Sequence, residues 1–235
     1  MAKGGAALLA LQQEVIACQR CPRLRAWCMQ VAARKRPAFR AWDYWAKPIP
    51  SFGDPAARLL IVGLAPAAHG ANRTGRIFTG DRSGDLLFRV LYQTGFASQP
   101  ISVAPDDGLR LRDVWITAAV RCAPPQNKPT PEEFRNCRPF LAREMELLEN
   151  LRVVVALGRL AFQACLAVLR ERGWAGSPAS LVFAHNKQHR LGPRLPVLIS
   201  SYHPSQQNTL TGRLTEPMLR QVFLRARRLL AKAEG

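Results

Sequence analysis

The chain has 235 residues, and its 34 Lys and Arg outnumber its 16 Asp and Glu, which gives a formal net charge of +18. This length can bury a core and corresponds to one domain or at most two. No apolar run approaches the roughly 18 residues of a membrane span, and Gln12, Gln13 and Glu14 interrupt the N-terminal apolar patch. We therefore expect a cytoplasmic protein without a signal peptide. The charge excess, mostly arginine, indicates a polyanionic partner, with nucleic acid ahead of a membrane surface.

The N-terminal part of the chain predicts one helix and a long surface segment. Apolar residues recur at helical spacing within residues 6–17, so a helix leads into the sequence Cys18-Gln19-Arg20-Cys21-Pro22. Residues 34–50 are rich in Pro, Trp and basic side chains and have no clear period. This composition indicates a surface excursion before the first strand.

Strands and helices alternate along the rest of the chain. Predicted strands cover residues 58–64, 113–119, 152–157 and 195–201, and predicted helices cover 83–94, 131–150, 158–171 and 216–233. The capping box Thr130-Pro131-Glu132-Glu133 marks one helix start. Such alternation implies right-handed crossovers and a parallel sheet covered on both faces. We predict an α/β fold, a three-layer α/β/α arrangement with a central four-stranded parallel sheet, as one domain over residues 1–235 in which residues 1–50 form an N-terminal helical appendage.

A long polar loop follows the first predicted strand. This first loop, residues 63–82, consists mainly of Gly, Ala, Pro, His, Asn, Arg and Thr. Strand, glycine-rich loop and helix in succession is how an α/β fold builds a site at the carboxyl end of a strand. An ordinary connection is the alternative, but long ordered loops in compact domains are uncommon and usually functional. The sequence therefore predicts a functional site in this loop.

The last predicted strand runs into a second loop, residues 200–215, with the sequence SSYHPSQQNTLTGRLT. The carboxyl ends of parallel strands share one edge, so this loop faces the first loop across a common cleft. His203 stands at the rim of that cleft, which favours a functional over a structural histidine. Arg213 and Leu214 pair a phosphate-binding cation with an apolar side chain of the kind that unstacks bases. The alternative for Leu214 is a buried contact before the helix that begins near Thr215.

The cysteines predict a metal centre. Cys18 and Cys21 form a CxxC pair, Cys122 follows a predicted strand, and Cys137 lies inside a predicted helix. These four thiolates from two distant segments can fix the N-terminal helix to the domain around a [4Fe-4S] cluster or a Zn(Cys)4 site, and spacing alone does not choose between them. A thioredoxin-like pair is set aside because the CxxC does not lie at a strand-to-helix turn. The other two cysteines are expected to pack in the core, namely Cys28 and Cys165, with Cys28 the alternative that could replace one of the four ligands.

With these features in place, the chain resembles the uracil-DNA glycosylase superfamily, specifically its family 5. The resemblance rests on GLAPAAHGANRTGRIFTGD at 63–81, on HPSQQNTLTGRLT at 203–215 and on the four cysteines. It implies a three-layer α/β/α fold with a four-stranded parallel sheet, a structural [4Fe-4S] cluster and no catalytic metal. It also implies monofunctional removal of uracil from DNA, with tolerance for hydroxymethyluracil, hypoxanthine and ethenocytosine, as the first step of base excision repair.

The resemblance implies roles for individual residues. Phe78 matches the side chain that stacks on the extruded base, His203 matches the His that contacts the uracil carbonyl, and Asp81 matches an Asp that orients or activates water. The rest of the base pocket is assigned to Gly63, Ala65, Ala118 and Asn208. DNA contacts are assigned to His69, Arg73, Arg76, Ser205, Arg213 and Leu214.

Three alanines depart from the pattern of better-known glycosylases. Ala65 and Ala67 stand where other families place Asp, Asn or Glu at the end of the first strand, and Ala118 stands where an Asn reads uracil. Both absences are typical of family 5. A pocket without that amide discriminates bases less sharply, because a wrong base leaves no buried amide unpaired.

Two other classes of function stay open at this point. A non-catalytic binder of damaged or single-stranded nucleic acid fits the charge, and an iron–sulfur redox protein fits the cysteines. For the glycosylase, the expected partner is DNA that contains uracil or another damaged base. A monomer associated with the nucleoid is expected, and no membrane partner.

Overall fold

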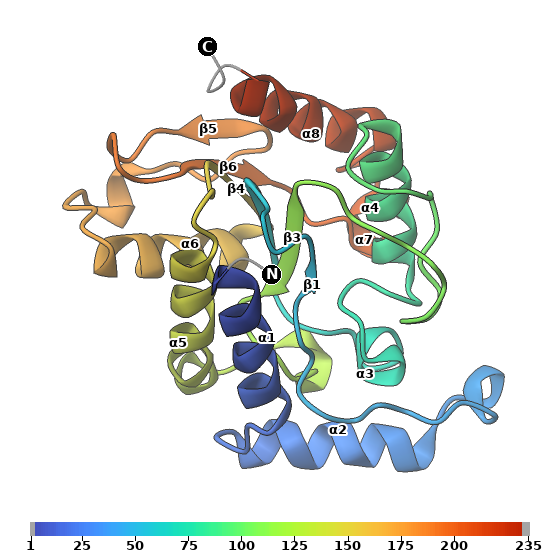
Figure 1. Cartoon of the computed structure of the whole chain (residues 1–235). Helices are drawn as coiled ribbons and strands as arrows, with labels where there is room; N and C mark the ends of the chain where they lie inside the picture. The colour runs from blue at the N-terminus through green and yellow to red at the C-terminus, as the bar shows by residue number, and fades with distance from the viewer. Residues whose placement is uncertain (1–2, 232–235) are drawn as a thin grey trace.

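A six-stranded sheet forms the centre of the computed structural model, which describes residues 3–231 (Figure 1). Its order is β1-β3-β2-β4-β6-β5, and the four inner strands run parallel while both edge strands are antiparallel. The strands are β1 (Phe52–Gly53), β2 (Leu59–Gly63), β3 (Val114–Ala118), β4 (Val153–Leu157), β5 (Lys187–His189) and β6 (Val197–Ser201). All residues of β2, β3 and β4 are buried, as strands covered on both faces require.

Helices cover both faces of the sheet. Leu59 and Ile61 of β2 pack with α4 and α8, whereas Leu60 and Val62 pack with α1, α5 and α6. Successive strand residues point to opposite faces, so this alternation defines three layers. No helix within residues 3–231 is long and apolar enough to cross a membrane. The helices are α1 (Lys3–Ile16), α2 (Pro22–Arg34), α3 (Ala71–Thr74), α4 (Arg82–Gln93), α5 (Pro131–Leu147), α6 (Arg159–Glu171), α7 (Gln206–Leu210) and α8 (Glu216–Ala231).

The α/β architecture agrees with the sequence, and several details differ, among them the short helices α3 and α7 inside the two predicted loops. The sheet has six strands rather than four, because the two short edge strands β1 and β5 add to the four predicted parallel strands. Helix α2 was not predicted, although Leu24, Cys28 and Val31 bury one of its faces. Residues 232–233 of the last predicted helix lie outside the described residues.

A buried polar network ties the N-terminal helix to the sheet. The Glu144 carboxylate of α5 is fully buried and accepts hydrogen bonds from Arg121 at 2.5 Å, from Thr117 of β3 at 2.7 Å, from Gln12 of α1 at 3.3 Å and from Ser51. The Arg121 side chain is 3% exposed. A buried ion pair is tolerated when further hydrogen bonds satisfy both charges, and this one joins two helices and a strand.

This network generates a stability prediction. Glu144→Gln removes the negative charge and leaves Arg121 buried without its counter-ion, so we expect the free energy of unfolding to fall by about 3–5 kcal/mol. Chemical denaturation measures it. The control is Glu14→Gln, which removes an exposed partner of Arg143 and is expected to cost less than about 1 kcal/mol. Equal losses in the two variants would contradict the role of the network.

Candidate active site

The first loop is built around two buried arginines. The Arg73 guanidinium donates to the carbonyl oxygens of His69 at 2.9 Å and Gly80 at 3.0 Å, and it lies 4.1 Å from the ring centroids of both Phe39 and Trp42. Only 4% of Arg73 is exposed. Cation–π contact and hydrogen bonds therefore hold the ends of this loop together and dock it on the 34–50 segment.

Arg76 is engaged in the same way. Its guanidinium donates to Thr79 at 3.0 Å and Ser102 at 2.7 Å, and it pairs with Asp107 at 2.5 Å. Like Arg73, it is 4% exposed. The sequence assigned both arginines to DNA contact. The structure instead buries both guanidinium groups among protein acceptors, so they build the loop and are not presented to a phosphate.

The conformation of Phe78 leaves no room for a Cβ atom at two neighbouring positions, Gly63 and Gly84. Its backbone has φ of +53°, a left-handed value that is rare for a bulky residue and is typical of functional sites. A Cβ on Gly63 would lie 2.7 Å from the Phe78 ring, and a Cβ on Gly84 would collide with the Phe78 carbonyl oxygen. The glycines at the end of β2 and in the first turn of α4 thus fix the position of this ring.

His203 lies against Phe78, as the shared sheet edge predicts. The two rings are stacked with centroids 6.0 Å apart and an interplanar angle of 30°. The Asn208 side-chain amide donates to the His203 carbonyl oxygen at 2.8 Å and holds the turn that follows β6. Ser205 caps α7 by accepting from the Asn208 backbone N–H at 3.4 Å. Ser205 and Asn208 therefore shape the second loop around His203.

Burial determines the protonation of His203. Desolvation lowers the pKa of its imidazole to about 4. The ring is therefore neutral at physiological pH, with one nitrogen as donor and the other as acceptor. A neutral imidazole can donate a hydrogen bond to an oxygen that gains negative charge without first losing a proton.

Asp81 caps helix α4. Its Oδ1 accepts from the backbone N–H groups of Ser83 at 2.9 Å and Gly84 at 3.1 Å, and its Oδ2 lies against Gly70. Burial raises the pKa of this carboxyl, although the two N–H groups act in the opposite direction. The residue matched to water activation thus also has a structural function that the sequence did not reveal.

The alanines of the predicted pocket lie on either side of Gly63. Ala118 ends β3 opposite Gly63 and is 1% exposed. Ala65 is partly buried and packs against the cysteine-containing cluster described below. Neither position carries a polar side chain at the carboxyl edge, where Phe78 and His203 stack.

His69 has partners that the sequence did not predict. The Tyr44 hydroxyl lies 2.9 Å from the His69 Nδ1, and the two rings meet edge to face. Burial, together with the charges of Arg36 and Arg73, lowers the pKa of this imidazole. Aromatic and basic residues were visible in the 34–50 segment, but no spacing rule connected them to the first loop.

The tip of the second loop differs from the prediction at one residue. Arg213 is exposed, and its guanidinium lies 4.8 Å from the Tyr202 ring centroid. Leu214 is 1% exposed and packs in the core, which is the buried alternative that the sequence allowed. Leu210, at the end of α7, is an exposed apolar side chain of the second loop, with 70% of its surface accessible.

The cysteines gather beside the first loop. Cys21, Cys28, Cys122 and Cys137 belong to one buried cluster, with Ala65 and Ala68 packed against it. Cys18 is close enough to influence the Cys21 thiol. Burial raises the pKa of the Cys137 thiol. Within residues 3–231, no three or more His, Cys, Asp and Glu side chains are grouped to hold a metal ion.

The lowered pKa of His203 generates a prediction on stability and pH. Unfolded His203 takes up a proton as the pH falls through 6.5, whereas the folded ring stays neutral down to about 4, so its contribution to stability is lost across this interval. We expect His203→Asn to lose less stability than the wild type between about pH 7 and about pH 4.5. Urea denaturation at both pH values measures this, and parallel losses would contradict it.

Comparisons with known proteins agree with these features. The sequence profile of the uracil DNA glycosylase superfamily matches residues 50–227. The type-5 uracil-DNA glycosylase of Thermus thermophilus is 52% identical over 220 residues, which cover 94% of this chain and 97% of that protein. The type-5 enzyme of Pyrobaculum aerophilum is 45% identical over 213 residues, 90% of this chain and 88% of that protein. This chain belongs to the uracil-DNA glycosylase superfamily and to its type-5 group.

Proposed function

We propose that this protein excises uracil from DNA by hydrolysis of the N-glycosidic bond and so initiates base excision repair. The observation that carries the proposal is the stacked pair of Phe78 and neutral His203 at the carboxyl edge of the sheet. The type-5 relatives, which are named uracil-DNA glycosylases, support it. The proposed unit is a single monomeric domain, residues 1–235, that acts on nucleoid DNA.

The chemistry follows from the groups at this edge. A base inside a duplex is out of reach, so the nucleotide rotates out into the pocket, where the uracil ring stacks on Phe78. Cleavage leaves negative charge on the uracil and positive character on the sugar. A hydrogen bond from neutral His203, with backbone N–H groups of the 63–68 turn, stabilises that negative charge in a dry site. Asp81 orients the attacking water and favours the positive sugar.

The proposal includes broad base tolerance. Ala65 and Ala118 leave the pocket without the amide that reads uracil elsewhere, so a different base meets no unpaired buried group. Hydroxymethyluracil, hypoxanthine and ethenocytosine are therefore proposed as further substrates. Product assays on duplexes that carry each base test this range.

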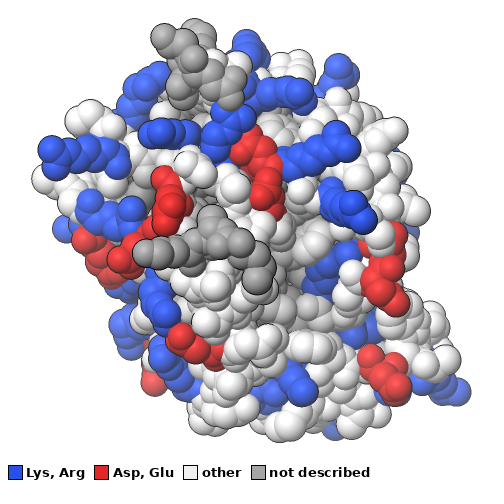
Figure 2. Space-filling view, in the orientation of Figure 1, with Lys and Arg blue, Asp and Glu red and all other residues white. Residues whose placement is uncertain are grey.

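DNA contact is proposed for exposed residues of the second loop and for the basic surface. Arg213 faces phosphate, and Leu210 takes the base-unstacking role that the sequence gave to Leu214, since Leu210 is exposed and Leu214 is buried. Basic side chains are spread over the face in Figure 2 rather than gathered in one patch. A spread of this kind suits sequence-independent attraction to a phosphate backbone.

We also propose a structural [4Fe-4S] cluster held by Cys18, Cys21, Cys122 and Cys137. The family resemblance implies this cluster, and Cys21, Cys122 and Cys137 lie in one buried group of side chains. The role of the cluster is to fix the N-terminal segment beside the first loop.

The surroundings of Arg25 indicate whether a negatively charged cluster fits beside these cysteines. The residue is 8% exposed and lies within electrostatic reach of Cys28 and Cys122. One nitrogen donates to the Ala46 carbonyl oxygen at 2.8 Å, but Nε and Nη1 find no hydrogen-bond partner within residues 3–231. A buried cation requires an anion, and a cluster with four thiolates supplies one.

The first prediction of this proposal concerns the cluster. Arg25→Gln should bind less iron and lose it several-fold faster in air than the wild type, because the charge that balances the thiolates is gone. Iron analysis and visible absorbance over time measure retention. Arg34→Gln, an exposed change on the same helix, is the control, and equal retention in both variants would remove Arg25 from this role.

The second prediction separates chemistry from structure at Asp81. Asn is as good a helix cap as Asp, so Asp81→Asn should keep the melting temperature while excision falls by about 10²–10⁴-fold. His203→Asn should reduce excision by about 10²–10³-fold. A uracil-containing duplex treated with alkali after reaction reveals the abasic product on a gel.

The controls for this assay address the rival functions. A pure nucleic-acid binder leaves no abasic site in the wild-type reaction, and that outcome would overturn the proposal. Near-normal turnover by Asp81→Asn would limit Asp81 to its capping function. Normal excision while the oxidation state of the cluster stays unchanged would exclude a redox role for the cluster.

A further inference from the structure

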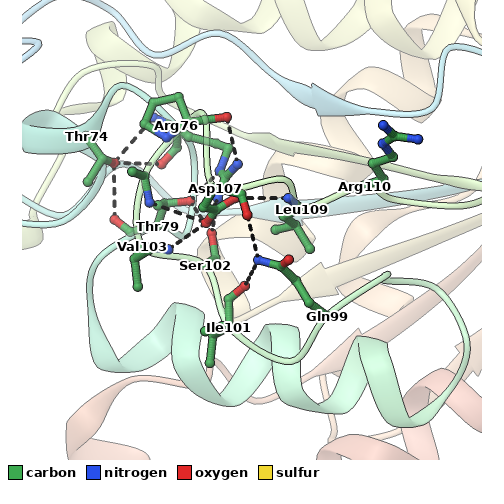
Figure 3. Close-up of polar contacts among 12 residues, drawn as sticks. Thr74, Arg76, Thr79, Gln99, Ile101, Ser102, Val103, Asp107, Leu109 and Arg110 are labelled. Carbon is green, nitrogen blue, oxygen red and sulfur yellow. Dashed lines mark hydrogen bonds and ion pairs between the residues drawn. The ribbon is translucent and has the colours of Figure 1, made fainter.

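The loop between α4 and β3 is held by a buried ion pair between Arg76 and Asp107 and by the hydrogen bonds around it (Figure 3). Ser98 and Arg110 close its base through two hydrogen bonds of 2.9 Å. Within this 98–110 loop, the Asp107 carboxylate accepts from the backbone N–H groups of Val103 at 2.8 Å and Leu109 at 3.1 Å. A loop with close ends and internal contacts of this kind is ordered without regular secondary structure.

The same ion pair fixes this loop to the first loop. Arg76 and Asp107 are joined at 2.5 Å, and their side chains are 4% and 7% exposed. Ser102 adds contacts to the first loop, since its hydroxyl lies 2.7 Å from the Thr79 hydroxyl and its carbonyl oxygen accepts from the Gly80 N–H at 3.2 Å. The 98–110 loop is therefore positioned directly beside the chain that leads into Asp81.

Two apolar side chains stand out from this anchored loop. Ser102 is 2% exposed, whereas its neighbours Ile101 and Val103 are 58% and 53% exposed. Burial of Ser102 turns the side chains on either side of it toward solvent. A buried ion pair is costly to form, and this one anchors the loop that carries the two exposed apolar groups.

We infer that Ile101 and Val103 contact the DNA beside the flipped nucleotide, as a second apolar contact in addition to that of Leu210. This inference rests on the proposed function. Extrusion of a nucleotide exposes base faces and sugar edges that were stacked, and rigid apolar side chains cover such surfaces at a low entropic cost. Exposed Arg110 at the base of this loop, and exposed Arg82 two residues after Gly80, provide positive charge for the flanking phosphates. Charge complementarity therefore selects DNA as the occupant.

The test compares duplex with single-stranded DNA. The double variant Ile101→Ser/Val103→Ser should lose about tenfold or more in single-turnover excision from a uracil duplex, because it stabilises the opened duplex less well. Excision from single-stranded uracil DNA, which has no stacked partner strand to open, should stay within about twofold of the wild type. The matched control is Val182→Ser, since Val182 is 61% exposed on another loop.

Each outcome decides one question. No excision by the wild type from either substrate would overturn the proposed function. An active wild type with the double variant equal to Val182→Ser would overturn this inference alone. Equal loss on both substrates would also overturn it, since the residues would then not act on the duplex. Ile101→Ser and Val103→Ser tested singly, with melting temperatures recorded, guard against a folding defect, and each should show part of the duplex-specific loss.

Discussion

The site depends on the burial of arginine side chains inside a loop that has little regular structure of its own. A loop of this length exposes many backbone carbonyl groups, and each buried one requires a donor. Arg73 and Arg76 each supply several N–H donors in a planar fork, so one side chain satisfies several acceptors at once. The first loop consequently has a core of its own, made of guanidinium groups, carbonyl oxygens and the rings of Phe39 and Trp42.

This arrangement changes the meaning of the high positive charge. Arg25, Arg73, Arg76 and Arg121 are all buried; Arg73 and Arg76 hold the first loop together, and Arg121 pairs with Glu144 in the network beneath the N-terminal helix. The excess of positive charge therefore has two separate functions. Buried arginines stabilise loops inside the protein, and exposed arginines attract a phosphate backbone. Only the exposed arginines, such as Arg213, are free to meet a phosphate backbone. Composition alone cannot separate these functions, because it does not show which arginines are buried.

The fold was predictable where local pattern and burial coincide. The four parallel strands are mainly apolar and almost entirely buried, and the capping box at Thr130 forms with both of its hydrogen bonds. The edge strands β1 and β5 escaped prediction because two or three residues carry no periodicity. Helix α2 escaped it because basic residues surround its narrow buried face. The sequence predicted that His203 and the first loop share one edge, but it could not reveal that Arg76 finds Asp107 or that Leu214 enters the core. Those contacts join segments far apart in the chain.

The cysteine cluster and the active site share a boundary. The Asn72 side chain is fully buried and donates to the carbonyl oxygens of Cys28 at 3.3 Å and Ala68 at 3.4 Å, while Ala65 and Ala68 pack against the cysteines. The turn after β2, whose N–H groups face the pocket in the proposed mechanism, thus rests on the segment that carries the thiols. An ordered metal centre there would fix the position of that turn relative to His203. Hydrogen bonds to a developing charge depend steeply on distance, so a centre that transfers no electrons can still be required for the rate.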